Sequence, residues 1–134
     1  MIDPQAALIY IMVMISAADN DMADAELRII GDFVNHLPIF AKYDKNRLTQ
    51  DLKSCAVLLG RDAGLEEALK DVKAALPAKL RETAYALACE VVAADRMAGQ
   101  DCLRMLELIG SELNIDPLVS AAIERGVRAR HQSV

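Results

Sequence analysis

The run Ala6-Ala7-Leu8-Ile9-Tyr10-Ile11-Met12-Val13-Met14-Ile15-Ser16-Ala17-Ala18 carries no charged side chain. Asp3 and Pro4 precede it and predict a helix start, because Asp caps a helix and Pro is tolerated at its first position. A helix that is apolar on all sides has to be covered by other helices. The run is also shorter than the roughly 20 residues that span a bilayer. We therefore predict that it forms a helix at the centre of a globular domain.

Along the rest of the chain, apolar residues recur at threes and fours, and no alternating strand pattern interrupts them. This periodicity predicts an all-α, single-domain helical bundle of about seven helices that takes up residues 1–134. Residues from His131 onward are expected to fray. The expected helices cover residues 6–18, 24–37, 45–59, 65–76, 77–94, 101–113 and 117–130.

The chain contains an ungapped internal repeat. Ala17-Ala18-Asp19 matches Ala93-Ala94-Asp95, and Leu27-Arg28 matches Leu103-Arg104 at the same spacing. Each unit is a buried helix, an Asp-bearing turn and an amphipathic helix. Two units are too few for a solenoid, so we predict two pseudo-repeated helix hairpins around one core. The repeat does not decide whether the two turns lie at the same end of the bundle.

The net charge of the chain indicates whether nucleic acid is an expected partner. The formal net charge is −5, from 20 acidic and 15 basic side chains. Nucleic-acid affinity comes mainly from basic side chains that face phosphates, so we expect no nucleic-acid partner. Arg125, Arg128 and Arg130 do gather near the end of the sequence. They fit a helix C-terminus, whose negative end favours cations, better than a binding tail.

Three cysteines, Cys55, Cys89 and Cys102, lie far apart among apolar neighbours. Their odd number argues against a disulfide framework, and the lack of a CxxC pair argues against a thiolate zinc site. We therefore expect reduced thiols in a cytoplasmic protein. The N-terminus has no basic region, so we expect no signal peptide.

The segment from Asp19 to Glu26 is rich in side-chain oxygens that could bind a cation. It fails the EF-hand calcium pattern, because Ala23 and Ile30 stand where that pattern requires oxygen ligands. Two interpretations stay open. The acids either interact favourably with the positive end of the next helix, or they form part of a divalent-cation site.

Glu90 lies within an otherwise apolar predicted helix. A buried carboxylate is costly, so it needs a cation, a hydrogen-bond donor or an exposed strip. Arg28 and Arg104, one on each amphipathic helix, are the expected partners. The two histidines, His36 and His131, have no neighbouring ligand at metal-binding spacing, which argues against zinc.

The sequence Ala18-Asp19-Asn20-Asp21-Met22-Ala23-Asp24-Ala25-Glu26-Leu27 resembles the signature of the TerB-like tellurite-resistance family. That signature is similar to Ala-Asp-Gly-Glu, an apolar residue, two variable residues and Glu-Glu-Leu, and it occurs in two helical units. Asn20 replaces the glycine, and Asn also accepts left-handed conformations. The second copy, residues 94–103, keeps Asp95 but has Cys102 in place of the Glu. The likeness covers essentially the whole chain.

This resemblance implies an all-α protein in the cytoplasm or at the inner face of the membrane, linked to resistance to tellurite and related chemical stress. It also implies protein partners and a divalent cation such as calcium at the acidic turns. Carried over by position, the metal-ligating candidates are Asp19 and Glu26 in the first unit and Asp95 in the second. Glu90 is a further candidate carboxylate from the residues alone, and Cys102 removes one acid from the second unit.

Three functions are compatible with these patterns. The first is a stress-response binding or scaffold module that holds a cation. The second is a purely structural interaction domain whose acids only cap helices. The third is a small metal-dependent hydrolase. No serine lies at a nucleophile elbow and the 6 glycines form no phosphate loop, so a classical enzyme is the least favoured.

The charge balance generates the first prediction. We expect the purified protein to leave the mobility of short DNA and RNA duplexes and single strands unchanged in a gel-shift assay. Sub-micromolar binding that weakens as salt rises would contradict it, because such binding requires the basic surface that this sequence lacks.

Overall fold

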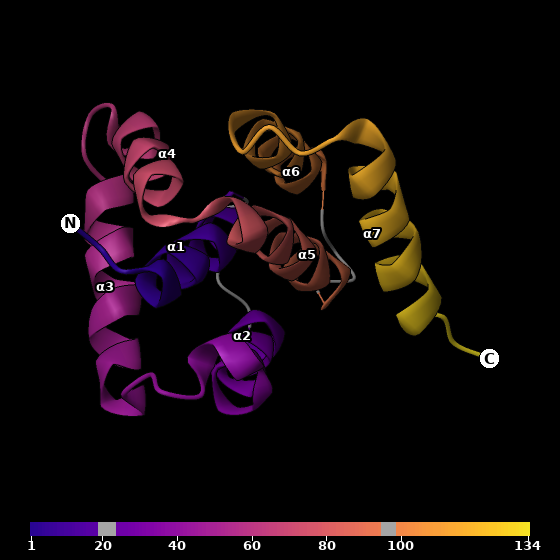
Figure 1. The fold of residues 1–134 in the computed structure, drawn as a ribbon, viewed down its shortest axis with the longest axis horizontal. Helices are drawn as coiled ribbons and strands as arrows, with labels where there is room; N and C mark the ends of the chain where they lie inside the picture. Colours follow the sequence, from indigo (N-terminus) through magenta and orange to yellow (C-terminus); the bar gives the residue numbers. More distant parts are fainter. Residues whose placement is uncertain (19–23, 95–98) are drawn as a thin grey trace.

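The computed structural model describes residues 1–18, 24–94 and 99–134. These ranges contain seven α-helices and no strand, which confirms the predicted all-α class (Figure 1). The helices are α1 (Pro4–Ala17), α2 (Asp24–His36), α3 (Leu48–Leu59), α4 (Gly64–Ala75), α5 (Ala78–Ala94), α6 (Gln100–Glu112) and α7 (Pro117–Arg130), with 3-10 helices at η1 (Pro38–Phe40) and η2 (Lys45–Arg47). None of the described helices is long and apolar enough to cross a membrane.

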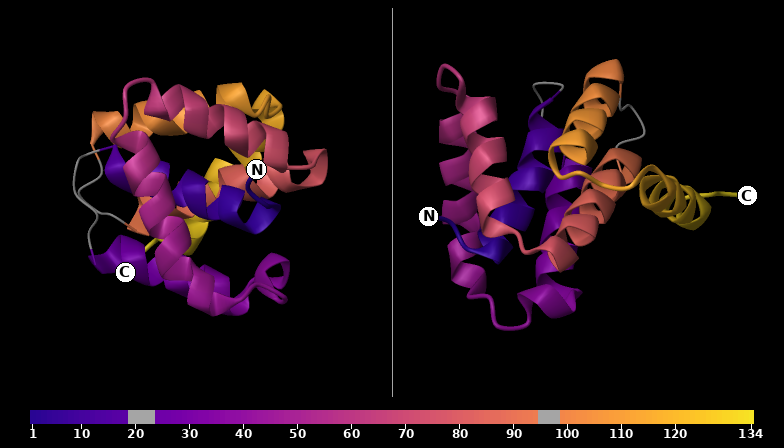
Figure 2. Two further views of the ribbon diagram at one scale, coloured as in Figure 1. Left: turned by 90° about the vertical axis from the view of Figure 1, so that its left-hand side faces the viewer. Right: turned by 45° about the horizontal axis from the view of Figure 1, so that its top comes forward.

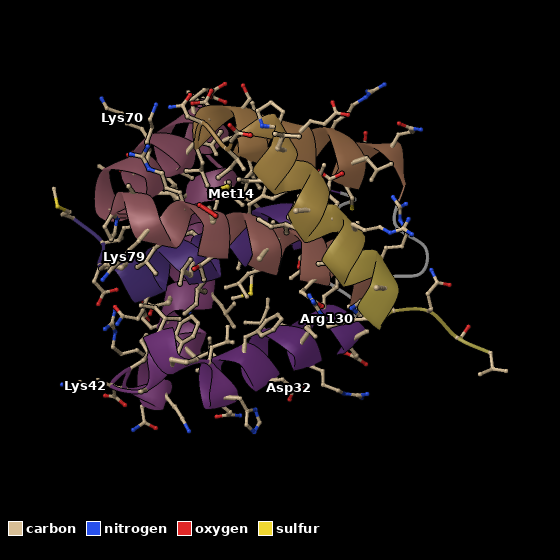
Figure 3. The ribbon with its side chains drawn as sticks, turned by 45° about the vertical axis from the view of Figure 1, so that its right-hand side comes forward. Met14, Asp32, Lys42, Lys70, Lys79 and Arg130 are labelled. Atoms are coloured by element: carbon tan, nitrogen blue, oxygen red, sulfur yellow. The ribbon has the colours of Figure 1, made fainter. Side chains whose placement is uncertain are left out.

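Helix α1 lies at the centre of the bundle, as its apolar sequence predicts. Every residue from Ala6 to Ser16 is buried, and α1 packs against α2, α3, α4, α5 and α6. In Figure 3, Met14 accordingly lies inside the bundle. The N-terminus of α1 is capped as expected, because the Asp3 carboxylate accepts a hydrogen bond from the Ala6 amide at 2.9 Å.

The two repeated hairpins pack around each other. Helices α1 and α5 are in contact, α2 lies against α5, and α6 lies against both α1 and α5. The Cys102 thiol, near the start of α6, donates to the carbonyl of Ile15, in the last turn of α1, over 3.7 Å. The residues that flank the two turns therefore lie at one end of the bundle, on the left of the left-hand view of Figure 2. The contact therefore brings the end of α1 and the start of α6 together.

A polar network fixes the start of α1 against the start of α3. Arg47 donates to the Asp3 carboxylate at 2.9 Å and lies 3.5 Å from Asp51. The Arg47 guanidinium also covers the Tyr43 ring at 5.0 Å, and the Tyr43 hydroxyl donates to Asp51 at 2.5 Å. Arg47 belongs to the 3-10 turn that precedes α3, so the helix predicted from residue 45 begins in 3-10 form.

Helix α7 packs chiefly on α5 and lies at one edge of the molecule (Figure 1). Its contact forms a small apolar cluster of its own, in which Tyr85, Cys89 and Val127 are buried. The chain reaches α7 after Asn114, whose φ of 54° is left-handed. Asn tolerates that conformation better than most residues. The separate cluster makes α7 the element least tied to the main core.

The three cysteines are buried, and no disulfide bond joins them. Burial raises the pKa of both Cys55 and Cys89 to about 12, because a thiolate is poorly solvated inside the bundle. At neutral pH these side chains are therefore neutral thiols that pack as small apolar groups.

The Asp3 cap generates the second prediction. We expect Asp3→Ala to lower the free energy of unfolding by about 0.5–2 kcal/mol, the usual cost of losing a capping acceptor. Asp3→Asn should cost less, because Asn also caps helices. The hydrogen bond from Arg47 holds the pKa of Asp3 below its ordinary value of 3.8. The charged form therefore contributes stability above that value, and the contribution is lost as the pH falls through the lower, folded pKa.

Urea unfolding of the wild type and both variants between pH 7 and pH 2.5 tests this expectation. The wild type should lose its advantage over Asp3→Asn in the acidic part of the range. Asp116→Ala is the matched control, since Asp116 caps α7 through the Leu118 amide at 2.8 Å and forms no ion pair with a described residue. An advantage over Asp3→Asn that stays constant across the range would refute the Arg47 contribution.

Candidate functional site

Of the four carboxylates predicted as metal ligands, two lie among the described residues. Asp19 and Asp95 lie outside the described residues. Glu26 is in the first turn of α2, and Glu90 is in the C-terminal half of α5. Both described carboxylates are buried, with 1% of Glu26 and 8% of Glu90 exposed.

The burial of Glu26 distinguishes it from an ordinary acid at a helix start. Asp24, in the same turn of α2, is exposed, although it interacts equally well with the helix dipole. The repeat counterpart of Glu26 is Cys102, which is also 1% exposed. In both hairpins this position therefore faces inward, and only the first hairpin places a carboxylate there.

Glu90 is paired across the α5–α7 contact, and its partners differ from the predicted ones. The expectation that Arg28 or Arg104 pairs with Glu90 is wrong. Arg130 donates to Glu90 Oε1, and His131 Nε2 lies 2.8 Å from Glu90 Oε2. In Figure 3, Arg130 lies at the end of α7, beside α5. We call these three residues the Glu90 clasp.

The Glu90 clasp corrects the expected fraying at His131 only, since residues 132–134 are exposed and lie outside α7. The His131 backbone amide bonds to the carbonyl of Val127, and its ring contacts Glu90. The pairing brings together residues that are 40 and 41 positions apart in the sequence. Neither residue lies three or four positions from Glu90, so helical spacing does not predict the contact. It forms because α7 folds back onto α5.

A second polar contact joins the same two helices. The Tyr85 hydroxyl donates to the Glu124 carboxylate at 2.8 Å. Burial and this hydrogen bond raise the pKa of Tyr85 above its ordinary value, so it stays protonated near neutral pH. Gly110 of α6 faces the same ring, and a Cβ there would lie 3.1 Å from Tyr85 Cε1. Tyr85 is therefore fixed from both α6 and α7.

A surface groove of about 340 Å³ lies between α5, α6 and α7. Helices α5 and α6 contribute apolar side chains and one thiol to it, while the polar side chains come from α7 and the residues that follow it. Leu103, on the α6 wall, is 45% exposed. The groove is lined by Cys89, Val92, Ala93, Leu103, Leu106, Glu124, Val127, Arg128, His131 and Gln132. The sequence did not single out this groove, because its residues come from three separate helices.

The described carboxylates of this region take part in contacts between helices. Within residues 1–18, 24–94 and 99–134, no three His, Cys, Asp or Glu side chains gather in a way that could hold a metal ion. Arg130 and His131 contact the two oxygens of Glu90, and Glu124 accepts a hydrogen bond from the Tyr85 hydroxyl. These carboxylates therefore hold α7 in place.

The Glu90 clasp generates the third prediction. We expect Glu90→Gln to lower the free energy of unfolding by about 1–2 kcal/mol. The reason is that two charge-assisted contacts become weaker, although Arg130 is largely exposed and partly screened. Amide hydrogen exchange should speed up most along α7, which can open locally, and less in α1, which opens only when the whole domain unfolds.

Glu82→Gln is the control for this substitution, because Glu82 is an exposed acid of α5 without an ion pair to any described residue. If exchange rises equally in α1 and α7, or if both variants lose the same stability, the clasp does not secure α7.

Known proteins give no further guide to this arrangement. The chain matches no protein-family model, no curated protein and no solved structure. Its function is therefore inferred from the residues, the fold and the resemblance of the acidic turn.

Proposed function

We propose that this protein is a TerB-like stress-response module of the tellurite-resistance type, which binds partner proteins and performs no catalysis. In this proposal a divalent cation such as calcium binds at the first acidic turn, with Asp19 and Glu26 as ligands. The single observation that carries the proposal is the burial of Glu26 directly after that turn.

The physical argument concerns the cost of burying a carboxylate. An acid that only interacts with a helix dipole can stay in water, as Asp24 does. Turning Glu26 inward costs desolvation free energy, which positive charge or hydrogen-bond donors must offset. A divalent cation held by Glu26 and Asp19 supplies positive charge at this place, and carboxylate oxygens are the ligands that calcium prefers.

The inward position holds Glu26 in the first hairpin and Cys102 in the second, which supports one cation site rather than two. The second hairpin has Cys102 at the inward position, and its thiol contacts the carbonyl of Ile15. A neutral thiol is a poor ligand for calcium, which prefers oxygen. Asp95 is therefore proposed to act in its turn without completing a second site. Glu90 is left out of the cation site, because the clasp engages both of its oxygens.

A second candidate function is a purely structural interaction domain without metal. The equal burial of Glu26 and Cys102 favours it, because the fold accepts a non-acidic residue at the same inward position. In that case the acids of both turns only stabilise the N-termini of the helices that follow them. The exposed faces of α2 and α6 are then the surfaces that bind partner proteins. Both candidates place the protein in the cytoplasm and predict different responses to calcium.

The fourth prediction separates these candidates by thermal melts in calcium and in chelator. A cation that binds only the folded state should raise the melting temperature of the wild type by several degrees, since saturation at about 100 times Kd contributes about 2.7 kcal/mol. Asp19→Ala and Glu26→Gln should abolish this rise. Asp95→Ala should keep most of it and serves as the matched control.

All three variants are also compared in chelator, which measures the structural cost of each change by itself. Identical melts of the wild type with calcium and with chelator would eliminate the cation site and leave the structural interaction domain. An equal loss of the calcium effect in Asp19→Ala and Asp95→Ala would contradict the assignment to the first hairpin.

A further inference from the structure

The groove between α5, α6 and α7 has an uncharged floor. Val92 and Ala93 of α5 and Leu103 and Leu106 of α6 supply most of its apolar surface. Cys89 adds a thiol that is neutral at physiological pH, because burial raises its pKa to about 12. A ligand that lies on this floor therefore presents an apolar surface to it.

The polar side chains of the groove all lie on the α7 side. Glu124 accepts the Tyr85 hydroxyl, and the His131 ring is engaged by Glu90. Arg128 is exposed and forms no ion pair or hydrogen bond with a described side chain. A guanidinium carries five N–H donors in a plane that matches a carboxylate. Among the described residues that line the groove, Arg128 is thus the charged side chain that is available to a ligand.

We propose that this groove binds a small amphipathic carboxylate, whose apolar body lies over Leu103, Leu106 and Val92 and whose anionic group pairs with Arg128. The volume of about 340 Å³ lies at the small end of the range of ligand sites, roughly 300–1,000 Å³. It therefore suits one short apolar chain or ring with a single charged end. The Glu90 clasp keeps the α7 wall in place, since His131 is part of both the clasp and the groove.

This inference is independent of the cation site. None of the described residues that line the groove belongs to α2, which follows the first acidic turn. Ligand binding is therefore expected to be the same in calcium and in chelator, and Asp19→Ala should bind the ligand as the wild type does. Failure of one proposal leaves the other intact.

The test uses decanoate, below its micelle concentration, as the probe. The full chain with labelled methyl groups is titrated in an NMR experiment in the presence of chelator. We expect saturable shifts of the methyl groups of Val92, Leu103, Leu106 and Val127. Val57 and Leu118 are exposed elsewhere on the surface, and their methyl groups should not move.

Two pairs of variants test the assignment. Arg128→Gln should weaken decanoate binding by about tenfold, the loss expected when one charge-assisted contact is removed. Arg125→Gln, an exposed arginine of the same helix outside the groove, should leave it unchanged. Leu103→Gln should also weaken binding, whereas Leu27→Gln should not. Leu27 is the repeat counterpart of Leu103, is 41% exposed and does not line the groove.

Decanol provides the comparison for charge, because it has the same chain without the carboxylate. Binding of decanol about tenfold weaker than that of decanoate supports the role of Arg128. The proposal is overturned if decanoate fails to bind or if its shifts spread to Val57 and Leu118. It is also overturned if the two members of either variant pair behave alike, or if decanol binds as tightly as decanoate.

Discussion

The arrangement of this protein depends on the need to remove α1 from water on all sides. A helix with one apolar stripe needs one covering layer, but α1 is buried around its whole circumference and therefore needs several. Helices α2 to α6 all contact it. The hydrophobic effect is not directional, and a few polar contacts between specific residues add to the close packing of the core. The Asp3–Arg47 pair joins α1 to α3, and the Cys102 thiol joins α6 to α1.

The two hairpins share a topology and use equivalent positions in different ways. The position occupied by Glu26 and Cys102 faces inward in both. One hairpin places an acid there, while the other places a small thiol that bonds to a backbone carbonyl. Similarly, Glu90 has Met14 as its repeat counterpart, and Met14 is completely buried in the core. The second hairpin instead has its buried acid, Glu90, on α5, where Arg130 of α7 supplies positive charge.

Local patterns in the sequence were sufficient to predict most of the fold. The periodicity predicted each helix to within a few residues, and the Asp-Pro pairs located the starts of α1 and α7. Periodicity and capping depend on residues that are close together in the sequence, so they can be recognised without knowing the fold. The partners of Glu90 could not be predicted, because Arg130 and His131 reach it only when α7 folds back onto α5. The groove was missed for the same reason. For the candidate site, the sequence identified Glu90 as an unusual acid, and the family resemblance pointed to Glu26 together with Asp19 and Asp95, which lie outside the described residues.

The position of the clasp along the chain has a consequence for synthesis on the ribosome. Glu90 is made well before Arg130 and His131, and chains grow at about 5–20 residues per second. During that interval the Glu90 carboxylate has no cation from α7 and must remain hydrated, which leaves the outer side of α5 open to water and to chaperones. The α1-centred core can assemble in the meantime, because its contacts do not require α7. Docking of α7 then brings Arg130 and His131 to Glu90, and a chain that lacks the last turn of α7 would leave this carboxylate without either of them.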